Sequence, residues 1–449
     1  MPTYLDRLSR FVCDTHLEGL EPSTVNAAKT VVLDTIGAML AGSQFPENAK
    51  LAQLAAKTGG QGPSTLLGQP GSASAVFAAL SNATAGVALE MDEGNRLGGG
   101  HAAIHVIPAA LAMAEERGAS GKEFLESVIA GYEVTSRIGT GTKVKKSVHS
   151  HGTWGTIGSA GATAKLMGFD EAQTALAINL AASMSPANTW TPCLEGATIR
   201  NLYPGRSGFQ GIMAAQLVLC GFTGLEDGPS DIYNNILGES FHTEAVVREL
   251  GVAGAYRIQH NYFKLHACCL YNHPVLDGVQ ALLGRERFGA GDIDYIKVEA
   301  PALATIMNDP EPANMLAAKF SLPYAVATAV VHNSTDITAF YPDRLQDPDT
   351  LDLSRRVDII SDPAMDLRRY DYPAAKVAIS LKDGRTLTEN VTAHHGDTEN
   401  PASREELVGK FNFLVQDVLG DEGSARVVET VGHLDALGNI RELTRLLRV

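Results

Sequence analysis

The most restrictive feature of this sequence is a nearly unbroken series of helical patterns up to about residue 255. Apolar residues recur there at helical spacing, and several stretches are dense in alanine, glycine and serine, which allows helices to approach one another closely. The segments expected to form helices are residues 22–42, 72–89, 121–138, 155–167, 170–182 and 208–219. Because few strand patterns interrupt them, this part is predicted to be all-helical.

The pattern changes beyond that point. Residues 295–300 alternate in the manner of a strand, and residues 377–381 and 386–391 predict a hairpin around a tight turn. A buried helix is expected at residues 317–331, and helical spacing returns from Arg404.

This order of patterns predicts a mainly α protein with two domains. A chain of 449 residues is longer than one hydrophobic core usually organises. We expect residues 1–265 and 397–449 to form a large helical domain, with residues 266–396 inserted as a smaller α+β domain.

Charge and cysteine content limit the partners and the compartment. The formal charge of −15, from 36 basic and 51 acidic residues, argues against nucleic acid or an anionic membrane as the main partner. Five irregularly spaced cysteines argue against a disulfide framework and favour the cytoplasm. The start of the chain does not resemble a signal peptide, and no apolar run approaches the roughly 20 residues of a membrane helix. A soluble cytoplasmic protein is expected.

Four short segments combine ionisable residues with glycine. In the first, Asp92, Arg96 and His101 lie on a glycine-rich connection between two apolar helices, which could fold around a ligand. A solvated loop that caps the next helix would explain the same pattern.

In the second segment, His149 and His151 come directly before the small-residue helix at 155–167. Backbone N–H groups at a helix start suit a carboxylate, and a histidine there can act as acid or base; it could also simply pack near Trp154. The two histidines and a remote carboxylate would alternatively suit a metal-dependent hydrolase. No H-E-x-x-H helix or paired C-x-x-C completes such a site, so no metal is predicted.

The third segment holds Arg200 and Arg206, whose planar guanidinium groups can bind carboxylates through two hydrogen bonds, although surface salt bridges are the common alternative. The fourth, at the predicted domain junction, holds Lys264, His266 and the vicinal Cys268 and Cys269. Clefts between domains are favoured ligand sites; the thiols could instead be a redox pair or simply buried. Phosphate-binding loops, dinucleotide fingerprints and serine-nucleophile motifs are not found, so no cofactor is predicted.

These segments, in this order, resemble the MmgE/PrpD superfamily, which includes 2-methylcitrate dehydratase, cis-aconitate decarboxylase and iminodisuccinate epimerase. The resemblance covers nearly the whole chain and is carried by residues 28–42, 88–94, 100–112, 131–139, 152–168, 263–277 and 318–327. It implies that the α+β domain is a lid, that the active site lies between lid and helical domain, and that the protein is a homodimer.

The resemblance also implies roles for single residues. The residues matched to catalytic positions, or expected to act there, are Asp92, His101, His149 and Lys264. The residues expected to bind a small di- or tricarboxylate are Arg96, Arg200, His266 and Cys269. His101 and His149 would be base and acid on two sides of a carbon next to a carboxylate, with Asp92 orienting a histidine.

Two departures bear on the substrate. The loop at residues 91–96 differs from the MDF-[ND]-DTW pattern of the dehydratase and decarboxylase, and Cys269 stands where the decarboxylase-like pattern has histidine. These differences leave an epimerase-like or another polycarboxylate-specific branch of the superfamily, and an iminodisuccinate-type epimerase is the best single assignment. A lyase similar to 2-methylcitrate dehydratase or cis-aconitate decarboxylase is the alternative, and a metal-dependent hydrolase is the alternative from another class.

Overall fold

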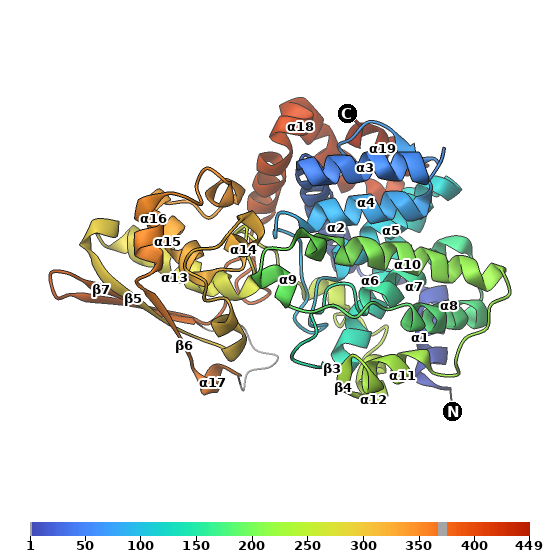
Figure 1. Ribbon diagram of the computed structural model, residues 1–449. Coiled ribbons are helices and arrows are strands. Elements are labelled where there is room, and N and C mark those ends of the chain that lie inside the picture. Colours follow the sequence, from blue (N-terminus) through green and yellow to red (C-terminus); the bar gives the residue numbers. More distant parts are fainter. Residues whose placement is uncertain (1, 367–374) are drawn as a thin grey trace.

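The structure, a computed structural model, describes residues 2–366 and 375–449. Figure 1 shows a larger part made of helices and a smaller part that contains a four-stranded sheet. The helices of the larger part that precede the sheet are α1 (Tyr4–Asp14), α2 (Pro22–Gly42), α3 (Pro46–Thr58), α4 (Ala75–Val87), α5 (Ala102–Arg117), α6 (Gly121–Gly141), α7 (Gly155–Met167), α8 (Glu171–Ser183), α9 (Thr191–Leu194), α10 (Leu202–Leu219), α11 (Gly228–Asn235) and α12 (Thr243–Val247).

Short strands join two pairs of loops in the larger part: β1 (Ser64–Thr65) with β2 (Ser72–Ala73), and β3 (Thr142–Val144) with β4 (Gly238–Phe241). The elements that follow are α13 (His273–Arg285), β5 (Ile293–Ala300), α14 (Met315–Lys319), α15 (Leu322–His332), α16 (Pro348–Ser354), β6 (Val357–Ser361), α17 (Pro363–Asp366), β7 (Ala375–Leu381), β8 (Thr386–Val391), α18 (Arg404–Gly432) and α19 (Arg441–Thr444).

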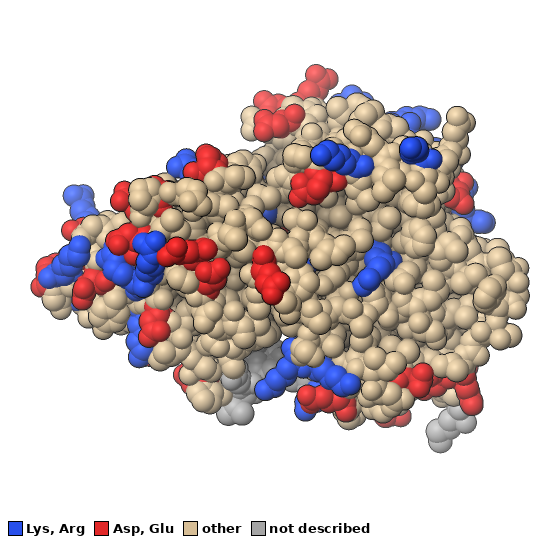
Figure 2. All heavy atoms as spheres, in the orientation of Figure 1, with Lys and Arg blue, Asp and Glu red and all other residues tan. Residues whose placement is uncertain are grey.

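The sheet has the strand order β6-β5-β7-β8, with β5 and β6 parallel and the other pairs antiparallel. Alternate residues of β7 are buried, which is the pattern of a strand with one face on a core. Helix α13 packs on that face at Gly278, where an added Cβ would lie 3.1 Å from a methyl group of Val377. In Figure 2, side chains of both charges are interspersed over this smaller part, and no separate basic patch is visible among the described residues drawn on this face.

Small residues bring the central helices of the larger part into backbone contact. An added Cβ on Gly158 of α7 would lie 1.6 Å from the Thr135 hydroxyl of α6, and one on Gly205 of α10 would lie 2.4 Å from the Leu80 carbonyl of α4. This close packing holds the loop before α7 and the start of α10 against the loop that follows α4.

Many of the expected elements are confirmed. The mainly α class, the helices at 22–42 and 155–167, and the hairpin of β7 and β8 are present. Of the described residues, none belongs to a helix that is both apolar enough and long enough to pass through a membrane. The domain boundaries at 265/266 and 396/397 remain predictions.

Three expectations about elements were wrong. Residues 72–73 form strand β2, because they pair with β1 before α4 begins. Helix α10 starts at Leu202 instead of residue 208; Pro204 is tolerated because its missing N–H falls in the unpaired first turn. The helix expected at 317–331 is two helices, because Ser321 caps the second one by accepting the Tyr324 N–H at 3.0 Å.

Candidate active site

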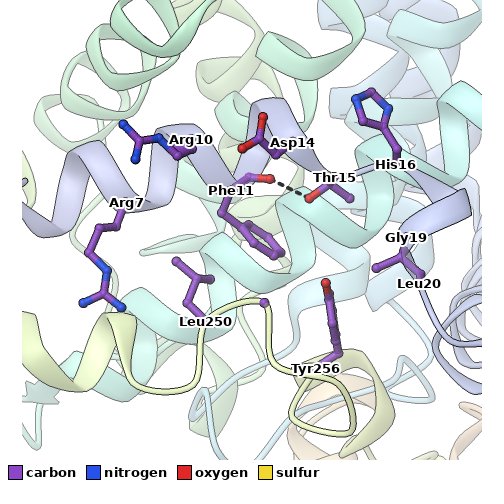
Figure 3. Close-up of a pocket in the computed structure, with 11 residues that line it drawn as sticks. Arg7, Arg10, Phe11, Asp14, Thr15, His16, Gly19, Leu20, Leu250 and Tyr256 are labelled. Atoms are coloured by element: carbon purple, nitrogen blue, oxygen red, sulfur yellow. Dashed lines mark hydrogen bonds between the residues drawn. The ribbon is translucent and has the colours of Figure 1, made fainter.

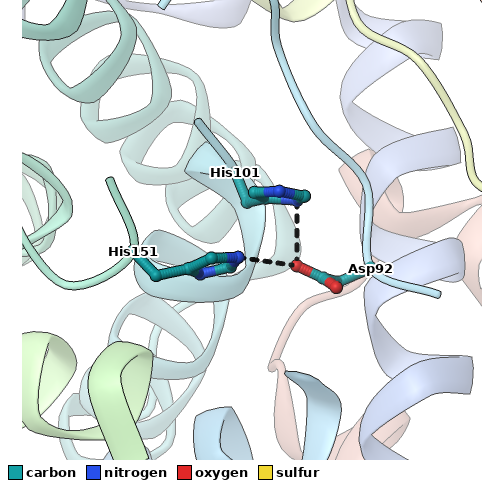
Figure 4. Close-up of side chains that lie close together, drawn as sticks. All are labelled: Asp92, His101 and His151. Atoms are coloured by element: carbon teal, nitrogen blue, oxygen red, sulfur yellow. Dashed lines mark ion pairs between the residues drawn. The ribbon is translucent and has the colours of Figure 1, made fainter. Parts of the chain in front are cut away.

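The loop between α4 and α5 carries the first group of ionisable residues, as the sequence predicted. Glu90 has a left-handed backbone conformation with a φ of 56°, which costs a residue with a side chain about 1 kcal/mol. Asp92 follows and is 1% exposed, and His101 ends the loop as the N-cap residue of α5. Asp92 Oδ2 lies 3.0 Å from His101 Nδ1, and this ion pair is marked in Figure 4. The loop therefore folds back to join a carboxylate and an imidazole.

The partners of His101 define its tautomer. Its Nδ1 lies 2.8 Å from the Glu93 carbonyl oxygen as well as 3.0 Å from the Asp92 carboxylate. Because both groups can only accept a hydrogen bond, Nδ1 carries the hydrogen. The lone pair of the neutral ring is then on Nε2, which is the nitrogen that can take up a proton. The Asp92 carboxylate is placed to stabilise the imidazolium that results.

His151 is stacked on His101. Their ring centroids are 4.2 Å apart and the ring planes differ by 18° (Figure 4). His151 is fully buried, its Nε2 lies 3.9 Å from Asp92 Oδ2, and neither ring nitrogen has a hydrogen-bond partner among the described residues. Since the rings are in contact, a substrate atom does not fit between these two histidines in this arrangement.

Backbone hydrogen bonds define two further tautomers. His105 donates from Nδ1 to the His101 carbonyl at 2.5 Å and accepts the Gly152 N–H on Nε2 at 2.8 Å. His149 accepts the His151 N–H on Nδ1 at 3.0 Å, so its own hydrogen is on Nε2, where no described residue accepts it. Neutral His149 is therefore a hydrogen-bond donor that a bound anion could use.

Burial keeps these histidines neutral. It lowers the pKa of His105 to about 4, and burial followed by the nearby cationic Arg200 lowers the pKa of His149 well below 6.5. The pKa of His151 is also lowered well below 6.5, first by burial and then by the charge on His101. A neutral imidazole that donates from Nε2 would have to become an imidazolate to lose its proton. His149 is thus better suited to hold an anion than to act as the acid that the sequence predicted.

Two buried cations lie beside the carboxylates. Arg200 forms an ion pair with Glu90, and Lys264 Nζ lies 3.1 Å from Glu90 Oε2 and 3.5 Å from Asp92 Oδ1. All four side chains are at most 2% exposed. Arg200 also lies over the Phe320 ring, with 5.1 Å between the guanidinium carbon and the ring centroid. The structure thus brings Asp92, Arg200 and Lys264 together. It also places the Glu90 carboxylate between the two cations.

These ion pairs keep the carboxylate and the ammonium group charged. Burial alone would raise the pKa of Asp92, but Lys264 and His101 outweigh it and hold that pKa well below its usual range. Burial alone would lower the pKa of Lys264, but Asp92 and Glu90 outweigh it and raise that pKa. Asp92 is therefore ionised and Lys264 protonated at neutral pH.

The neutral histidines should make the protein labile to acid. The unfolded chain binds protons on His149 and His151 below about pH 6.5, whereas the folded chain does not, so stability falls as the pH drops below that value. Each such group contributes about 1.4 kcal/mol per pH unit until its folded pKa is reached. Urea unfolding at pH 7 and pH 5 should show this loss, and a smaller loss in His151→Phe; an equal loss in both proteins would contradict it.

Two of the residues expected to bind substrate are engaged elsewhere. Arg96 forms a 2.6 Å ion pair with Asp397, close to where the chain returns to α18. His266 uses both ring nitrogens, with Nδ1 2.6 Å from the Thr335 hydroxyl and Nε2 2.9 Å from Asp277 Oδ1. Their substrate-binding roles remain predictions.

Cys269 is buried near Lys264, and burial raises the pKa of its thiol to about 11. A thiol with such a pKa is protonated at neutral pH and is a poor nucleophile. Its expected role in binding also remains a prediction.

Sequence reasoning did not include two members of this cluster. Glu90 was not singled out, and His151 was considered only as a metal ligand. A signal was available for His151, because it lies two residues from His149 at the same loop before α7. Glu90 had none, because only the tertiary packing shows that it lies between Arg200 and Lys264.

Buried polar atoms without hydrogen-bond partners among the described residues concentrate in this cluster. They include His149 Nε2, both ring nitrogens of His151, and Nε of Arg200. Such atoms are rare in folded proteins and need an explanation. An anionic ligand with several oxygens would satisfy the donors among them.

Asp92, His101 and His151 also have the composition of a metal site, with one potential ligand atom from each within 4.8 Å of the others. His149, which the hydrolase interpretation required, is not in this group. Two contacts oppose a cation: Lys264 is 3.5 Å from Asp92 Oδ1, and His101 Nδ1 already donates to the Glu93 carbonyl. These residues fit proton transfer better than metal binding.

A surface pocket of about 400 Å³ lies elsewhere, between α1 and the loop that ends at Tyr256 (Figure 3). Two of its ionisable groups already have carboxylate partners. Arg10 pairs with Glu171, and His16 lies 3.5 Å from Glu126. None of the predicted site residues lines it.

The chain matches two described protein domains. The MmgE/PrpD N-terminal domain matches residues 6–237, and the MmgE/PrpD C-terminal domain matches residues 266–435. Among similar proteins, the cis-aconitate decarboxylase of Aspergillus terreus is 26% identical, over 95% of this chain and 92% of its own length. The cis-aconitate decarboxylases of Mus musculus and Homo sapiens are each 25% identical, over 96% of this chain and 90% and 91% of their own lengths.

Proposed function

This chain belongs to the MmgE/PrpD family, and we propose that it is a lyase that releases CO₂ from a small unsaturated polycarboxylate of the cis-aconitate type. Full-length similarity to proteins named cis-aconitate decarboxylase supports the reaction class. The observation that carries the proposal is the buried cluster in which His149 Nε2 and Arg200 Nε find no hydrogen-bond partner in the described part of the chain, beside the ion pair of Asp92 and His101.

In the proposed reaction His101 supplies a proton. The bond between a carboxylate carbon and the neighbouring substrate carbon breaks, and CO₂ leaves. The electron pair stays on the substrate, shifts through the adjacent double bond and takes up a proton at carbon. Protonated His101 gives that proton from Nε2, while Asp92 stabilises the imidazolium beforehand. Water then protonates His101 again, through a side chain that is 12% exposed.

The remaining groups would hold the negative charge. Arg200 Nε and the Nε2–H of neutral His149 are suited to the carboxylate that stays on the product, where charge builds up as CO₂ leaves. The Trp190 ring packs on His149 with 4.1 Å between centroids, which restrains the direction of that donor. Glu90 lies between Arg200 and Lys264 and offsets part of their positive charge before substrate binds.

The epimerase expectation is not supported by the similar proteins, and one feature of the site weighs against it. Epimerisation needs acid–base groups on opposite faces of a carbon. His101 can take up a proton on Nε2, whereas His149 and His151 are neutral and His151 lies against the His101 ring. The homodimer, the cytoplasmic location and the absence of a cofactor also remain predictions.

Proton NMR in D₂O of EDTA-treated protein with cis-aconitate, citrate, 2-methylcitrate and iminodisuccinate tests the proposal. Loss of CO₂ from cis-aconitate, with one deuterium added to carbon, is the expected result. Loss of water from a hydroxy acid, or deuterium exchange in iminodisuccinate alone, would replace the proposal with a dehydratase or an epimerase. Activity that returns only after metal is added would favour a metal enzyme, and no reaction with any compound would overturn the proposal.

Replacement of His149 by alanine is expected to lower kcat by a factor of about 10² to 10³, the usual effect of removing one donor to a developing anion. The pH dependence of kcat should not change, because His149 stays neutral in the working range. His149→Gln, which keeps an N–H donor, should recover part of the rate. A pH profile that loses a limb in His149→Ala would instead make this residue the acid.

A further inference from the structure

The C-terminal helix α18 returns to the loop that carries the site carboxylates. Lys410 of α18 donates from Nζ to Asp34 Oδ1 of α2 at 2.6 Å and to the Met91 carbonyl at 2.7 Å. All three residues are buried, with 8%, 6% and 3% of their surface exposed, respectively. A lysine from the last fifth of the chain therefore holds the peptide group directly before Asp92.

The packing of α18 on α2 explains how Lys410 reaches this position. Gly37 faces Phe411, and an added Cβ on Gly37 would lie 2.9 Å from Phe411 Cδ2. Phe411 follows Lys410, and Gly37 lies one helical turn after Asp34. The close approach at Gly37 thus brings the Lys410 ammonium group between the carboxylate of α2 and the loop.

The peptide group that Lys410 binds lies between a residue in the left-handed conformation and a carboxylate of the site. Met91 lies between Glu90, whose φ is 56°, and Asp92, whose carboxylate contacts both His101 and Lys264. A left-handed residue with a side chain persists only where its surroundings stabilise it. A charge-assisted hydrogen bond in a buried position supplies such stabilisation, because its loss would leave a carbonyl and a carboxylate without their partner.

We propose that Lys410 is a positioning residue, whose hydrogen bond to Met91 sets the direction of the Asp92 carboxylate and, through it, the orientation of His101. The inference rests on the proposed function only for its kinetic consequence. A shift of the loop by about 1 Å is enough to lower a reaction rate by roughly 10² when it moves an acid–base group. Substrate binding should change little, because Lys410 contacts neither Arg200 nor His149.

Lys410 could instead serve only to hold α18 on α2, and the chain offers a matched control for that role. Lys29 of α2 lies 2.6 Å from Asp435 Oδ1 and donates to the Gly432 carbonyl of α18 at 2.9 Å. It joins α2 to the last residue of α18 and to the segment that follows it, also through a lysine, a carboxylate and a carbonyl, but it does not contact the loop. Lys29→Met therefore removes a comparable link between α2 and α18 and leaves the contact with Met91 unchanged.

The experiment compares Lys410→Met, Lys410→Arg and Lys29→Met by kcat, KM and urea unfolding. We expect kcat to fall about 10²-fold in Lys410→Met with KM within about threefold of wild type, part of the rate to return in Lys410→Arg, and kcat to be unchanged in Lys29→Met. Equal kcat values in Lys410→Met and Lys29→Met, or an effect on KM alone, would overturn the inference. If Lys410→Met does not fold, Lys410→Gln, whose polar end is one bond closer to the backbone, replaces it.

A measurement without substrate separates this inference from the proposed function. Histidine ring signals in NMR spectra report the environment of His101 whatever the protein acts on. The His101 signals should shift in Lys410→Met and stay in place in Lys29→Met. If they stay in place in both variants, the positioning role is wrong even where the wild type proves to be a decarboxylase.

Discussion

His101→Asn is expected to lower kcat by a factor of about 10² to 10⁴, the range that positioned acid–base groups contribute, while the fold is retained. The asparagine amide can still donate to Asp92 and to the Glu93 carbonyl from nearly the position of Nδ1, so the loop keeps its contacts. Nε2, the nitrogen that moves the proton, is lost together with the ring that stacks on His151. CO₂ release from cis-aconitate gives kcat, and circular dichroism checks the fold.

The control for this variant is a histidine in a comparable ion pair at the surface. His395 Nε2 lies 2.7 Å from Glu406 Oε1, and both side chains are more than a third exposed. His395→Asn should keep the wild-type kcat. If His101→Asn kept at least a tenth of the wild-type rate, His101 would not be the proton donor.

Lys264→Met is expected to destabilise the protein by about 3–5 kcal/mol at pH 7.5, the usual result of removing one partner from a buried ion pair. The substitution removes the Lys264 ammonium from both Asp92 and Glu90, while Glu90 keeps its ion pair with Arg200. Lys143→Met is the matched surface substitution, since Lys143 pairs with Glu239 where both side chains are exposed. It should cost less than about 1 kcal/mol.

The loss of stability caused by Lys264→Met, relative to the wild type, should become smaller in acid. In the wild type the low pKa of Asp92 contributes stability above the unfolded pKa of about 4, and that contribution is lost as the pH falls further. Without Lys264 the pKa of Asp92 in the folded protein rises. The variant therefore lacks this contribution at neutral pH, and in acid its folded form can take up a proton on Asp92. Urea unfolding at pH 7.5 and pH 4 measures the difference. A deficit that is equal at both pH values, or no larger than that of Lys143→Met, would show that Lys264 does not stabilise the carboxylates.

Helix positions could be predicted where the determining interactions are local. Ser120 and Asp170 each form a capping box, so the starts of α6 and α8 follow from a few consecutive residues. The break between α14 and α15 was missed because their apolar residues run on without a gap, and the cap that separates them is a single serine, Ser321. The early start of α10 was missed because glycine and proline look like a connection until the close contact of Gly205 with α4 is known.

The site could be predicted only as a set of segments. Asp92 and His101 share one loop, so their meeting was foreseeable. The pairing of Glu90 with Arg200 and Lys264 depends on three separate parts of the chain, and nothing in the local sequence encodes it. The roles of the histidines depend on single backbone hydrogen bonds, such as the one from His151 N–H to His149 Nδ1, which no spacing rule predicts.

The most direct test is a crystal structure of the protein with propane-1,2,3-tricarboxylate, a saturated tricarboxylate that has no double bond to support loss of CO₂. One carboxylate should accept hydrogen bonds from Arg200 Nε and His149 Nε2, and a ligand carbon should lie within reach of His101 Nε2. Binding of the tricarboxylate in the surface pocket beside Arg10 and His16, with the buried cluster unchanged, would contradict this location of the active site.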